Sequence, residues 1–188
     1  MEQAKPAAEF AALAAELSPQ LLRYLRRYAG DTAVADDLLQ ETLIRMARGL
    51  AGFEGRSSAK TWAFAIATRV ALDYFRIPAH RASIVDMDEA EQVADPARLV
   101  EEQMAVDEMN ACIRQVIDSL PGDYRAALVL HDLEGQTARE IAEICGVSLS
   151  TVKIRIHRAR SRLKAALDVQ CDFYRDGENV FRCNRKAG

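Results

Sequence analysis

The sequence is short of the residues that interrupt helices, and this shortage already limits its fold. The 188 residues include only 9 glycines and 5 prolines, and aromatic residues make up 6% of the chain. Because glycine and proline are the poorest helix formers, the long stretches between them favour an all-α protein. Apolar residues account for 49% and charged residues for 28%, so the chain can bury a core and is not disordered throughout.

Membrane, secretion and disulfide patterns are missing as well. The sequence has no run of 18 apolar residues, and its start, MEQAKPAAEF, lacks the basic and apolar regions of a signal peptide. We therefore expect a cytoplasmic protein without a membrane span. The cysteines are too few and too scattered for a disulfide scaffold; they are Cys112, Cys145, Cys171 and Cys183. Cys112 and Cys145 fall on apolar helix positions, so we interpret them as small buried residues.

No arrangement of residues typical of catalysis is present either. His80, His131 and His157 are far apart along the chain, and neither a glycine-rich phosphate loop nor a nucleophile with an evident base occurs. We therefore expect a protein that is not an enzyme and that holds no cofactor or metal.

The net charge of −3 hides an uneven distribution. The charge balance is +2 in residues 1–83, −9 in 84–123, +3 in 124–168 and +1 in 169–188. An acidic total alone would argue against a nucleic-acid partner, but here two mildly basic parts flank an acidic middle. We expect DNA contacts in the two basic parts and weak affinity of the free chain for DNA, because few phosphates can be neutralised.

Apolar spacing predicts three helices in a first domain at residues 9–78. Apolar residues recur at steps of three and four over 10–28, 38–50 and 62–77, which is the period of one buried helix face. Asp31 or Thr32 is available to cap the second helix, and Ser57 or Ser58 the third. Pro78 ends the third helix.

A second domain is expected at residues 105–168, with helices near 109–120, 122–133, 137–145 and 148–167. Residues 79–104 form the expected flexible linker, which contains an acidic cluster at 86–91. Its composition favours a solvated spacer, and the alternative is an acidic segment that binds a partner or imitates DNA.

Residues 137–152 have the layout of a helix-turn-helix. Thr137 and Glu140 have the spacing of a capping box, Gly146 allows a left-handed turn, and Ser148 can cap the following helix.

A helical wheel with Val152 buried gives that last helix a distinct outer face, made of Ser150, Ile154, His157, Arg158 and Ser161. A recognition helix presents its outer face to bases and its flanks to phosphates. We therefore expect base contacts from Ile154, His157 and Arg158. Backbone contacts are expected from the flanking residues Thr151, Lys153 and Arg155.

Several short patterns occur in addition to the helix-turn-helix. They are Asp36-Asp37-Leu38-Leu39-Gln40-Glu41-Thr42, Thr61-Trp62, Ala71-Leu72-Asp73-Tyr74-Phe75-Arg76, Leu120-Pro121, Ser150-Thr151-Val152-Lys153 and His157-Arg158-Ala159-Arg160. These patterns follow one another in this order over residues 10–168. On that basis the chain resembles the extracytoplasmic-function (ECF) sigma factors, which are small two-domain members of the sigma-70 family. The resemblance implies a region 2 helical bundle at 9–78 and a region 4 helix-turn-helix at 105–168. It also implies binding to core RNA polymerase, recognition of the −10 and −35 elements of promoter DNA, and control by an anti-sigma factor.

The resemblance assigns contact residues as well. Contacts with the clamp helices of RNA polymerase fall on Asp37, Leu38, Gln40, Glu41 and Thr42. Contacts with the −10 element fall on Phe53, Arg56, Lys60, Trp62, Arg69 and Arg76. Contacts with the −35 element fall on Arg139, Ser150, Thr151, Lys153, Ile154, Arg155, His157 and Arg158. Considered without the family, the acidic residues also suit the N-terminus of a solvated helix, and Trp62 suits a buried position as well as a base-stacking one.

The chain departs from the family pattern at three positions. Where the family commonly has Ile-Ala-Arg-Asn, this sequence has Ile66-Ala67-Thr68-Arg69, so an arginine replaces the asparagine expected to face the promoter. Ile154 stands where a small polar residue is common. The promoter sequence read by the family therefore does not carry over to this chain.

The tail at 169–188 is the least expected part of the sequence. Asp176-Gly177 is typical of a turn between β-prone residues, and folding the chain symmetrically about Gly177 places Cys171 opposite Cys183. Three interpretations stay open: an appendage, a redox-responsive pair of Cys171 and Cys183, or half of a metal site. Two cysteines do not fill a tetrahedral zinc site, so a metal would need further ligands.

Two other functions fit parts of the sequence. A stand-alone helix-turn-helix regulator would bind duplex promoters by itself and would carry a ligand pocket in its first domain. A small thiol-redox or metal-dependent protein would use Cys171 and Cys183 and would turn over without polymerase.

Overall fold

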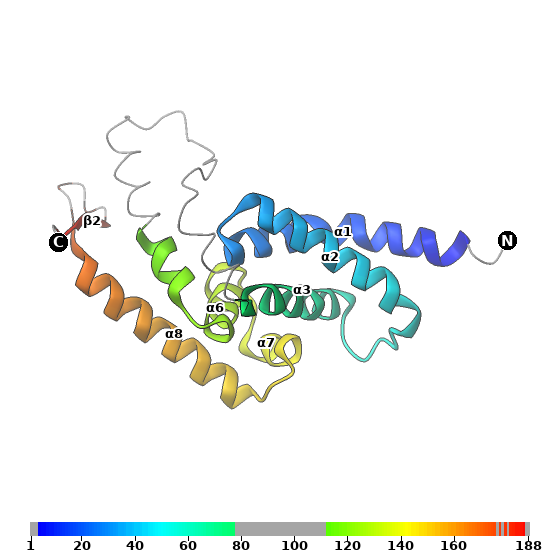
Figure 1. Cartoon of the computed structure of the whole chain (residues 1–188). Coiled ribbons are helices and arrows are strands. Elements are labelled where there is room, and N and C mark those ends of the chain that lie inside the picture. Colours follow the sequence, from blue (N-terminus) through cyan, green and yellow to red (C-terminus); the bar gives the residue numbers. More distant parts are fainter. Residues whose placement is uncertain (1–3, 78–111, 176, 178, 180, 187–188) are drawn as a thin grey trace.

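The protein is built from helices and ends in a β-hairpin (Figure 1). The computed structural model describes residues 4–77, 112–175, 177, 179 and 181–186, so the expected linker at 79–104 lies outside the described residues. The elements are α1 (Ala4–Ala29), α2 (Thr32–Gly49), the short 3-10 turn η1 (Leu50–Gly52), α3 (Ala59–Arg76), α6 (Gly122–Leu128), η3 (Val129–Leu133), α7 (Ala138–Cys145), α8 (Leu149–Gln170), β1 (Cys171–Arg175) and β2 (Phe181–Arg185). Residues 112–119 are also helical. The predicted helical class is confirmed for both halves of the chain.

Side chains cap several helices where the sequence predicts it. Asp31 caps α2 and Ser58 caps α3, each by accepting a hydrogen bond from the backbone N–H three residues further on. Thr137 and Glu140 form the expected capping box at the start of α7, and Gly146 ends that helix in the left-handed region at φ 64°. These capping contacts provide hydrogen-bond partners for backbone groups that a helix end leaves without an intrahelical partner.

Two helices differ from expectation near their C-terminal ends. Ile77 was expected on the apolar stripe of the third helix, but it lies just past the end of α3 and is half exposed. The helix expected at 122–133 changes character after Leu128, since Val129–Leu133 is wound as a π-helix. The wider turn still buries Val129 and Leu130.

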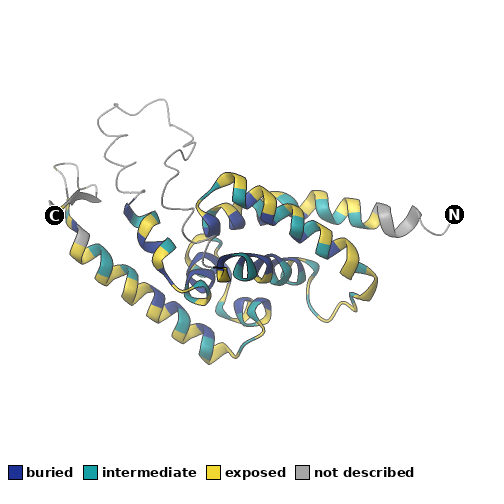
Figure 2. Cartoon of the chain, viewed as in Figure 1, coloured by how far each residue is buried: buried dark blue, intermediate teal, exposed yellow. Residues whose placement is uncertain are grey.

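One apolar core runs through both halves of the protein. In the first half, Tyr24 of α1 contacts Phe64 of α3, and Tyr28 contacts Phe75, with ring centroids 5.5 Å and 5.7 Å apart. In the second half, the buried faces of α6 and of α7 each pack against α8. Figure 2 shows these buried faces turned inward and the outer side of α8 exposed. The continuity of the core explains why α7 packs against α3.

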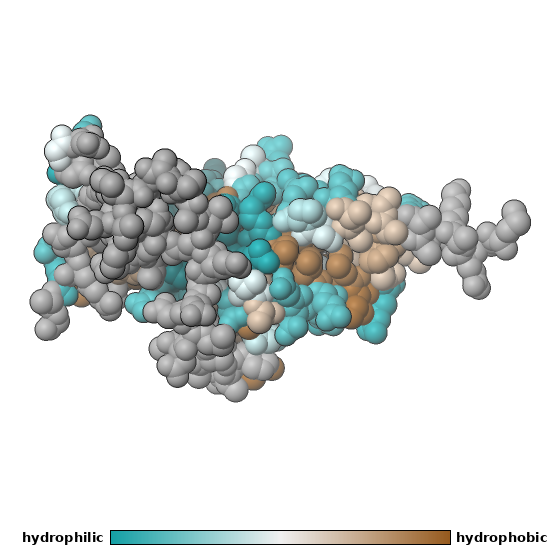
Figure 3. All heavy atoms as spheres, turned by 90° about the horizontal axis from the view of Figure 1, so that it is seen from above, coloured by the Kyte–Doolittle hydropathy of each residue, from teal (hydrophilic) through white to brown (hydrophobic). Residues whose placement is uncertain are grey.

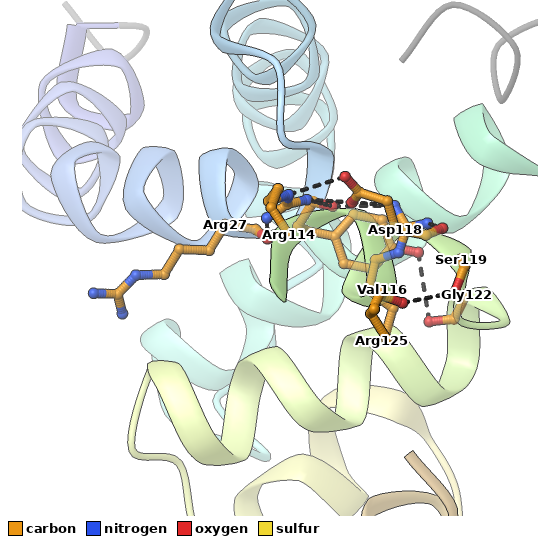
Figure 4. Close-up of polar contacts among 8 residues, drawn as sticks. Arg27, Arg114, Val116, Asp118, Ser119, Gly122 and Arg125 are labelled. Atoms are coloured by element: carbon orange, nitrogen blue, oxygen red, sulfur yellow. Dashed lines mark hydrogen bonds and ion pairs between the residues drawn. The ribbon is translucent and has the colours of Figure 1, made fainter. Parts of the chain in front are cut away.

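Two arginines of the second half cap the C-terminus of α1 (Figure 4). Arg114 donates hydrogen bonds to the carbonyl oxygens of Arg27 and Tyr28, and Arg125 donates to that of Tyr28 at 3.2 Å. Asp118 forms ion pairs with both arginines. The last carbonyls of a helix lack intrahelical donors and carry partial negative charge, so cationic donors are favoured there.

A buried carboxylate adds a second polar contact between the halves. The side chain of Glu134, which follows η3, is 1% exposed and forms ion pairs of 2.9 Å with Arg23 and with Arg27 on α1. Because a buried charge is tolerated only when it is paired, both arginines help to keep the loop after η3 against α1.

The described surface is mainly hydrophilic, and Figure 3 shows one face on which apolar residues gather in a limited area. The large apolar side chains that the described residues expose include Ile44, Leu133, Leu149 and Ile154. Within the described ranges, none of the helices combines the length and the apolar character needed to cross a membrane.

The hairpin at the tail forms, but the predicted pairing is wrong by two residues. Cys171 pairs with Arg185, and Cys183 pairs with Phe173. The innermost pair is Arg175 with Phe181, so five residues connect the strands instead of a tight turn centred on Gly177. Cys171 therefore does not lie opposite Cys183.

The contact at the end of α1 predicts a specific intolerance at Gly30. This residue has φ +79°, and an added Cβ would lie 2.7 Å from Nε of Arg114. We expect Gly30→Ala to lower the free energy of unfolding by about 2–3 kcal/mol, from left-handed strain and displacement of the arginine. Gly55→Ala is the matched control, because Gly55 has φ +69° with nothing within 4 Å of an added Cβ; its expected cost is about 1 kcal/mol. Equal losses in urea unfolding of the two variants would contradict the interpretation.

Candidate polymerase and nucleic-acid interfaces

The residues expected to contact polymerase divide into two sets on α2. Asp37 and Gln40 are exposed and Glu41 is half-buried, whereas Leu38 and Thr42 belong to the buried core. Oγ1 of Thr42 donates to the Leu38 carbonyl oxygen at 2.7 Å. The structure thus presents two carboxylates and an amide to solvent, while the other two residues fix the helix on the core. Arg45 pairs with Glu41 at 2.7 Å, which also raises the pKa of the arginine.

The residues expected at the −10 element lie on the loop before α3 and along that helix. Phe53 and Trp62 are both half-buried, with ring centroids 4.9 Å apart, so the two rings pack on each other. Arg56, Lys60 and Arg69 are exposed. Nζ of Lys60 lies 5.8 Å from the ring centre of Phe64, one turn further along α3, which is a cation–π contact.

Position 68, where the sequence departs from the family pattern, is buried in the core. Oγ1 of Thr68 is 3.0 Å from the Tyr24 hydroxyl, and burial raises the pKa of Tyr24 well above its usual value despite this hydrogen bond. Arg69 next to it is exposed, and Arg76 at the end of α3 pairs with Asp73 at 3.1 Å. Of the two residues here that differ from the family pattern, Thr68 and Arg69, only Arg69 is therefore accessible to a partner.

The second helix of the helix-turn-helix, α8, has the two faces that the wheel predicts. Val152, Ile156 and Ala159 are buried. The opposite side is exposed, and Ile154 keeps half of its surface accessible. Ser148 caps the N-terminus of α8 by accepting a hydrogen bond from the Thr151 backbone at 3.1 Å. The other predicted −35 residues that are exposed are Arg139 on α7 and, on α8, Ser150, Lys153, His157 and Arg158.

Arginines of α8 also contact polar groups within the protein. Arg155, which is largely buried, pairs with Asp123 at 2.8 Å. Arg158 donates to the Tyr124 hydroxyl at 3.3 Å, and this hydrogen bond lowers the pKa of Tyr124. Arg162 lies 5.0 Å from the Tyr124 ring centre. The N-terminal residues of α6 therefore orient the positive side of α8.

The sequence of this chain was compared with protein families and with individual relatives. Residues 13–77 match the sigma-70 region 2 family, and residues 110–163 match the sigma-70 region 4 family. The RNA polymerase sigma-H factor of Pseudomonas aeruginosa is 31% identical over 155 residues, covering 79% of this chain and 80% of that protein. The ECF sigma factor EcfG of Rhodopseudomonas palustris is 32% identical over 157 residues, covering 80% and 81%.

The chain is a member of the ECF sigma factors. It therefore belongs to the transcription initiation factors of the sigma-70 family, as the resemblance predicts. Solved structures agree with the fold. The sigma factor RpoE, in complex with the anti-sigma factor NepR from Bartonella quintana, has a TM-score of 0.61 at 26% identity, covering 86% of this chain and 98% of that chain. CnrH, in complex with the cytosolic domain of CnrY, has a TM-score of 0.62 at 24% identity, covering 88% and 94%.

The residues that join the two halves of this sigma factor could not be recognised from its sequence. Arg114, Arg125 and Glu134 make contacts with α1 across 86 to 111 positions of sequence. The local spacing of charges does not distinguish these residues. Arg125 does stand in an otherwise apolar run, and a cation in such a run is expected to be buried and paired.

The ion pair between α8 and η3 predicts a pH dependence of stability. Arg160 donates from Nε to Asp132 at 2.9 Å, and this hydrogen bond, with a further one from His131, lowers the pKa of Asp132. A lowered folded-state pKa gives stability that is present above the unfolded pKa, near 3.9, and is lost as pH falls through the folded value. We expect Asp132→Asn to cost about 0.5–1 kcal/mol at pH 7.

Unfolding of this variant and of wild type should be measured between pH 7 and pH 3. The difference should shrink below about pH 4, because wild type then loses the same charge by protonation. Asp168→Asn removes the same charge from an exposed position on α8 and should show no such trend. A difference that stays constant down to pH 3 would contradict the assignment.

Proposed function

We propose that this sigma factor contacts core RNA polymerase with the exposed face of α2, the −10 element with α3 and its preceding loop, and the −35 element with α8. The observation that carries the proposal is the exposed outer face of α8, with Lys153, His157 and Arg158 accessible on the side opposite the buried stripe. A helix of this kind, preceded by a glycine turn, fits the major groove with its N-terminal residues toward the bases.

The polymerase contact is supported by the chemistry of α2. Asp37 and Gln40 are exposed. Glu41 is half-buried and forms an ion pair with Arg45. Carboxylates and amides on one helix surface offer charge-assisted hydrogen bonds to basic groups of a partner. We propose that Leu38 and Thr42 act indirectly, by holding α2 in place.

Promoter binding would require the two halves to separate. The −10 and −35 elements are about 25 base pairs apart, or about 85 Å of B-DNA at about 3.4 Å per base pair. In this structure α7 packs against α3, and even α1, with 26 residues, is only about 39 Å long at about 1.5 Å per residue. We propose that polymerase stabilises an open arrangement in which α3 and α8 reach their elements.

An anti-sigma factor is the further partner that we propose. The similar RpoE structure contains a sigma factor bound to the anti-sigma factor NepR. In the arrangement described above, α7 of the helix-turn-helix packs against α3, which we propose is incompatible with binding both promoter elements. A protein that binds and stabilises this arrangement would inhibit transcription. We place the protein in the cytoplasm, where the polymerase acts.

The proposal is tested by in vitro transcription with purified core RNA polymerase. Adding the chain should produce initiation at its own promoters, and Asp37→Asn should reduce the affinity for core enzyme several-fold, as expected for loss of about 1–2 kcal/mol of charge-assisted hydrogen bonding. Glu16→Gln, which neutralises an exposed carboxylate on α1, is the control and should bind as wild type does. Absence of promoter-specific initiation would refute the function, whereas equal affinities of the two variants would refute only the proposed surface.

A second variant tests the orientation of α8 on DNA. Lys153 is exposed at the N-terminal end of α8, and Lys164 lies on the same side about 16 Å further along the helix axis. For the holoenzyme on a promoter fragment, we expect Lys153→Ala to weaken binding and to reduce the slope of log affinity against log salt by about 1. Lys164→Ala should leave the slope closer to wild type. A larger effect of Lys164→Ala would show that the C-terminal end of α8 faces the phosphates instead.

A further inference from the structure

Two cysteines that lie 59 positions apart meet at the tail of the protein. The Sγ atoms of Cys112 and Cys171 are 3.2 Å apart, and the two residues are only 8% and 3% exposed. Both are present as thiols. The sequence suggests a pair of Cys171 with Cys183, but the hairpin register places Cys183 opposite Phe173.

The backbone around each thiol explains why they meet. Cys171 ends α8, where its N–H donates to the Leu167 carbonyl oxygen, and it also begins β1. Cys112 lies on the helical segment that the structure describes over 112–119. The C-terminal end of α8 thus places Cys171 against the helical segment that carries Arg114 and Asp118.

We propose that Cys112 and Cys171 form a reversible disulfide when the protein meets a thiol oxidant. A disulfide needs an S–S distance of about 2.05 Å, so the sulfurs have to approach by only about 1 Å. Two thiols that are buried against each other, from segments distant in sequence, already have most of the geometry that such a bond requires. The site is independent of the surfaces proposed for polymerase and DNA.

The oxidation balances with a disulfide such as oxidised glutathione as the electron acceptor. The Cys171 thiolate attacks one glutathione sulfur, which breaks the S–S bond and releases one glutathione thiolate. The Cys112 thiolate then attacks Sγ of Cys171, forms the protein disulfide and releases the second glutathione. In total the two cysteines lose two electrons and two protons, and one oxidised glutathione becomes two reduced molecules.

Access to the buried pair is expected through opening of the hairpin. A two-stranded hairpin has little stability of its own in water, and local opening at a chain end costs less than global unfolding. When β1 and β2 open, Cys171 becomes available to the oxidant, and reclosing returns it to Cys112. The cross-link would close a loop that includes the helix-turn-helix, and it would fix the end of α8 to the segment bearing Arg114.

A metal site is less well supported by the same residues. Among the described residues, no three His, Cys, Asp or Glu side chains come together as a metal site would require. Two thiolates leave a tetrahedral zinc ion half-coordinated. We therefore assign the pair to redox chemistry and make zinc an outcome of the test.

The four cysteines can be followed separately, because trypsin is expected to place each in its own peptide. These peptides are 99–114, 140–153, 165–175 and 183–185, with Cys112, Cys145, Cys171 and Cys183 respectively. The full chain should be incubated with oxidised glutathione, alkylated and digested without reductant. We expect the linked pair 99–114 with 165–175 to exceed every other cysteine pair by about tenfold, and dithiothreitol to remove it.

Single variants identify the bond. Cys112→Ser and Cys171→Ser should each abolish the linked peptide, whereas Cys183→Ser should retain it. Cys145→Ser is a control at a half-buried thiol on α7, whose pKa burial raises to about 11, and it should retain the bond as well. In wild type, oxidation should raise Tm by roughly 5 °C or more through the cross-link, and neither single variant of the pair should show this rise.

Three results would overturn the proposal. The first is a dominant link between 165–175 and 183–185, which would restore the pair suggested by the sequence. The second is no enrichment of the Cys112–Cys171 link over other pairs. The third is stoichiometric zinc in the purified protein that protects Cys112 and Cys171 from alkylation until a chelator is added. None of these readouts depends on transcription.

Discussion

The capping of α1 by two arginines is the contact on which the arrangement of the molecule depends. The carbonyl oxygens of Arg27 and Tyr28 have no donors left within α1, and Arg114 and Arg125 of the other half supply them. Arg125 is 5% exposed and its guanidinium lies over the rings of Tyr28 and Phe75, with its charge opposed by Asp118. Separating the halves would expose these carbonyls and rings together, so the compact form is a defined state and not a loose association.

The same principle of paired charge applies to the surface proposed for DNA. Arg155 and Arg158, two of the expected −35 contacts, each contact a polar partner on α6. Arg160, further along α8, pairs with Asp132 of η3. A phosphate would have to replace or supplement these partners, so part of the Coulomb attraction is already used within the protein. Together with the acidic middle of the sequence, this argues that the free sigma factor binds DNA weakly and that polymerase supplies the additional affinity.

Features set by neighbouring residues could be predicted from the sequence, and features set by distant ones could not. The caps at Asp31 and Ser58 and the turn at Gly146 depend on residues within one helical turn, and the structure shows all three. The ion pair of Glu134 with Arg23 of α1 joins residues 111 positions apart, and no local sequence pattern predicts it. The predicted hairpin pairing was wrong for another reason. A shift of two residues leaves the alternation along each strand unchanged, so alternation alone could not choose between the two pairings.

Residues of α2 and α3 that are compared with the family pattern have two different roles, according to whether they are buried or exposed. Leu38, Thr42 and Thr68 are buried, so any effect they have on a partner passes through the position of α2 or α3. Asp37 and Arg69 are exposed on the same helices and can touch a partner directly. Buried positions such as these act by packing against the core, whereas exposed ones are placed to contact a partner. A change such as the arginine at position 69 therefore falls where specificity for a promoter can vary without cost to the fold.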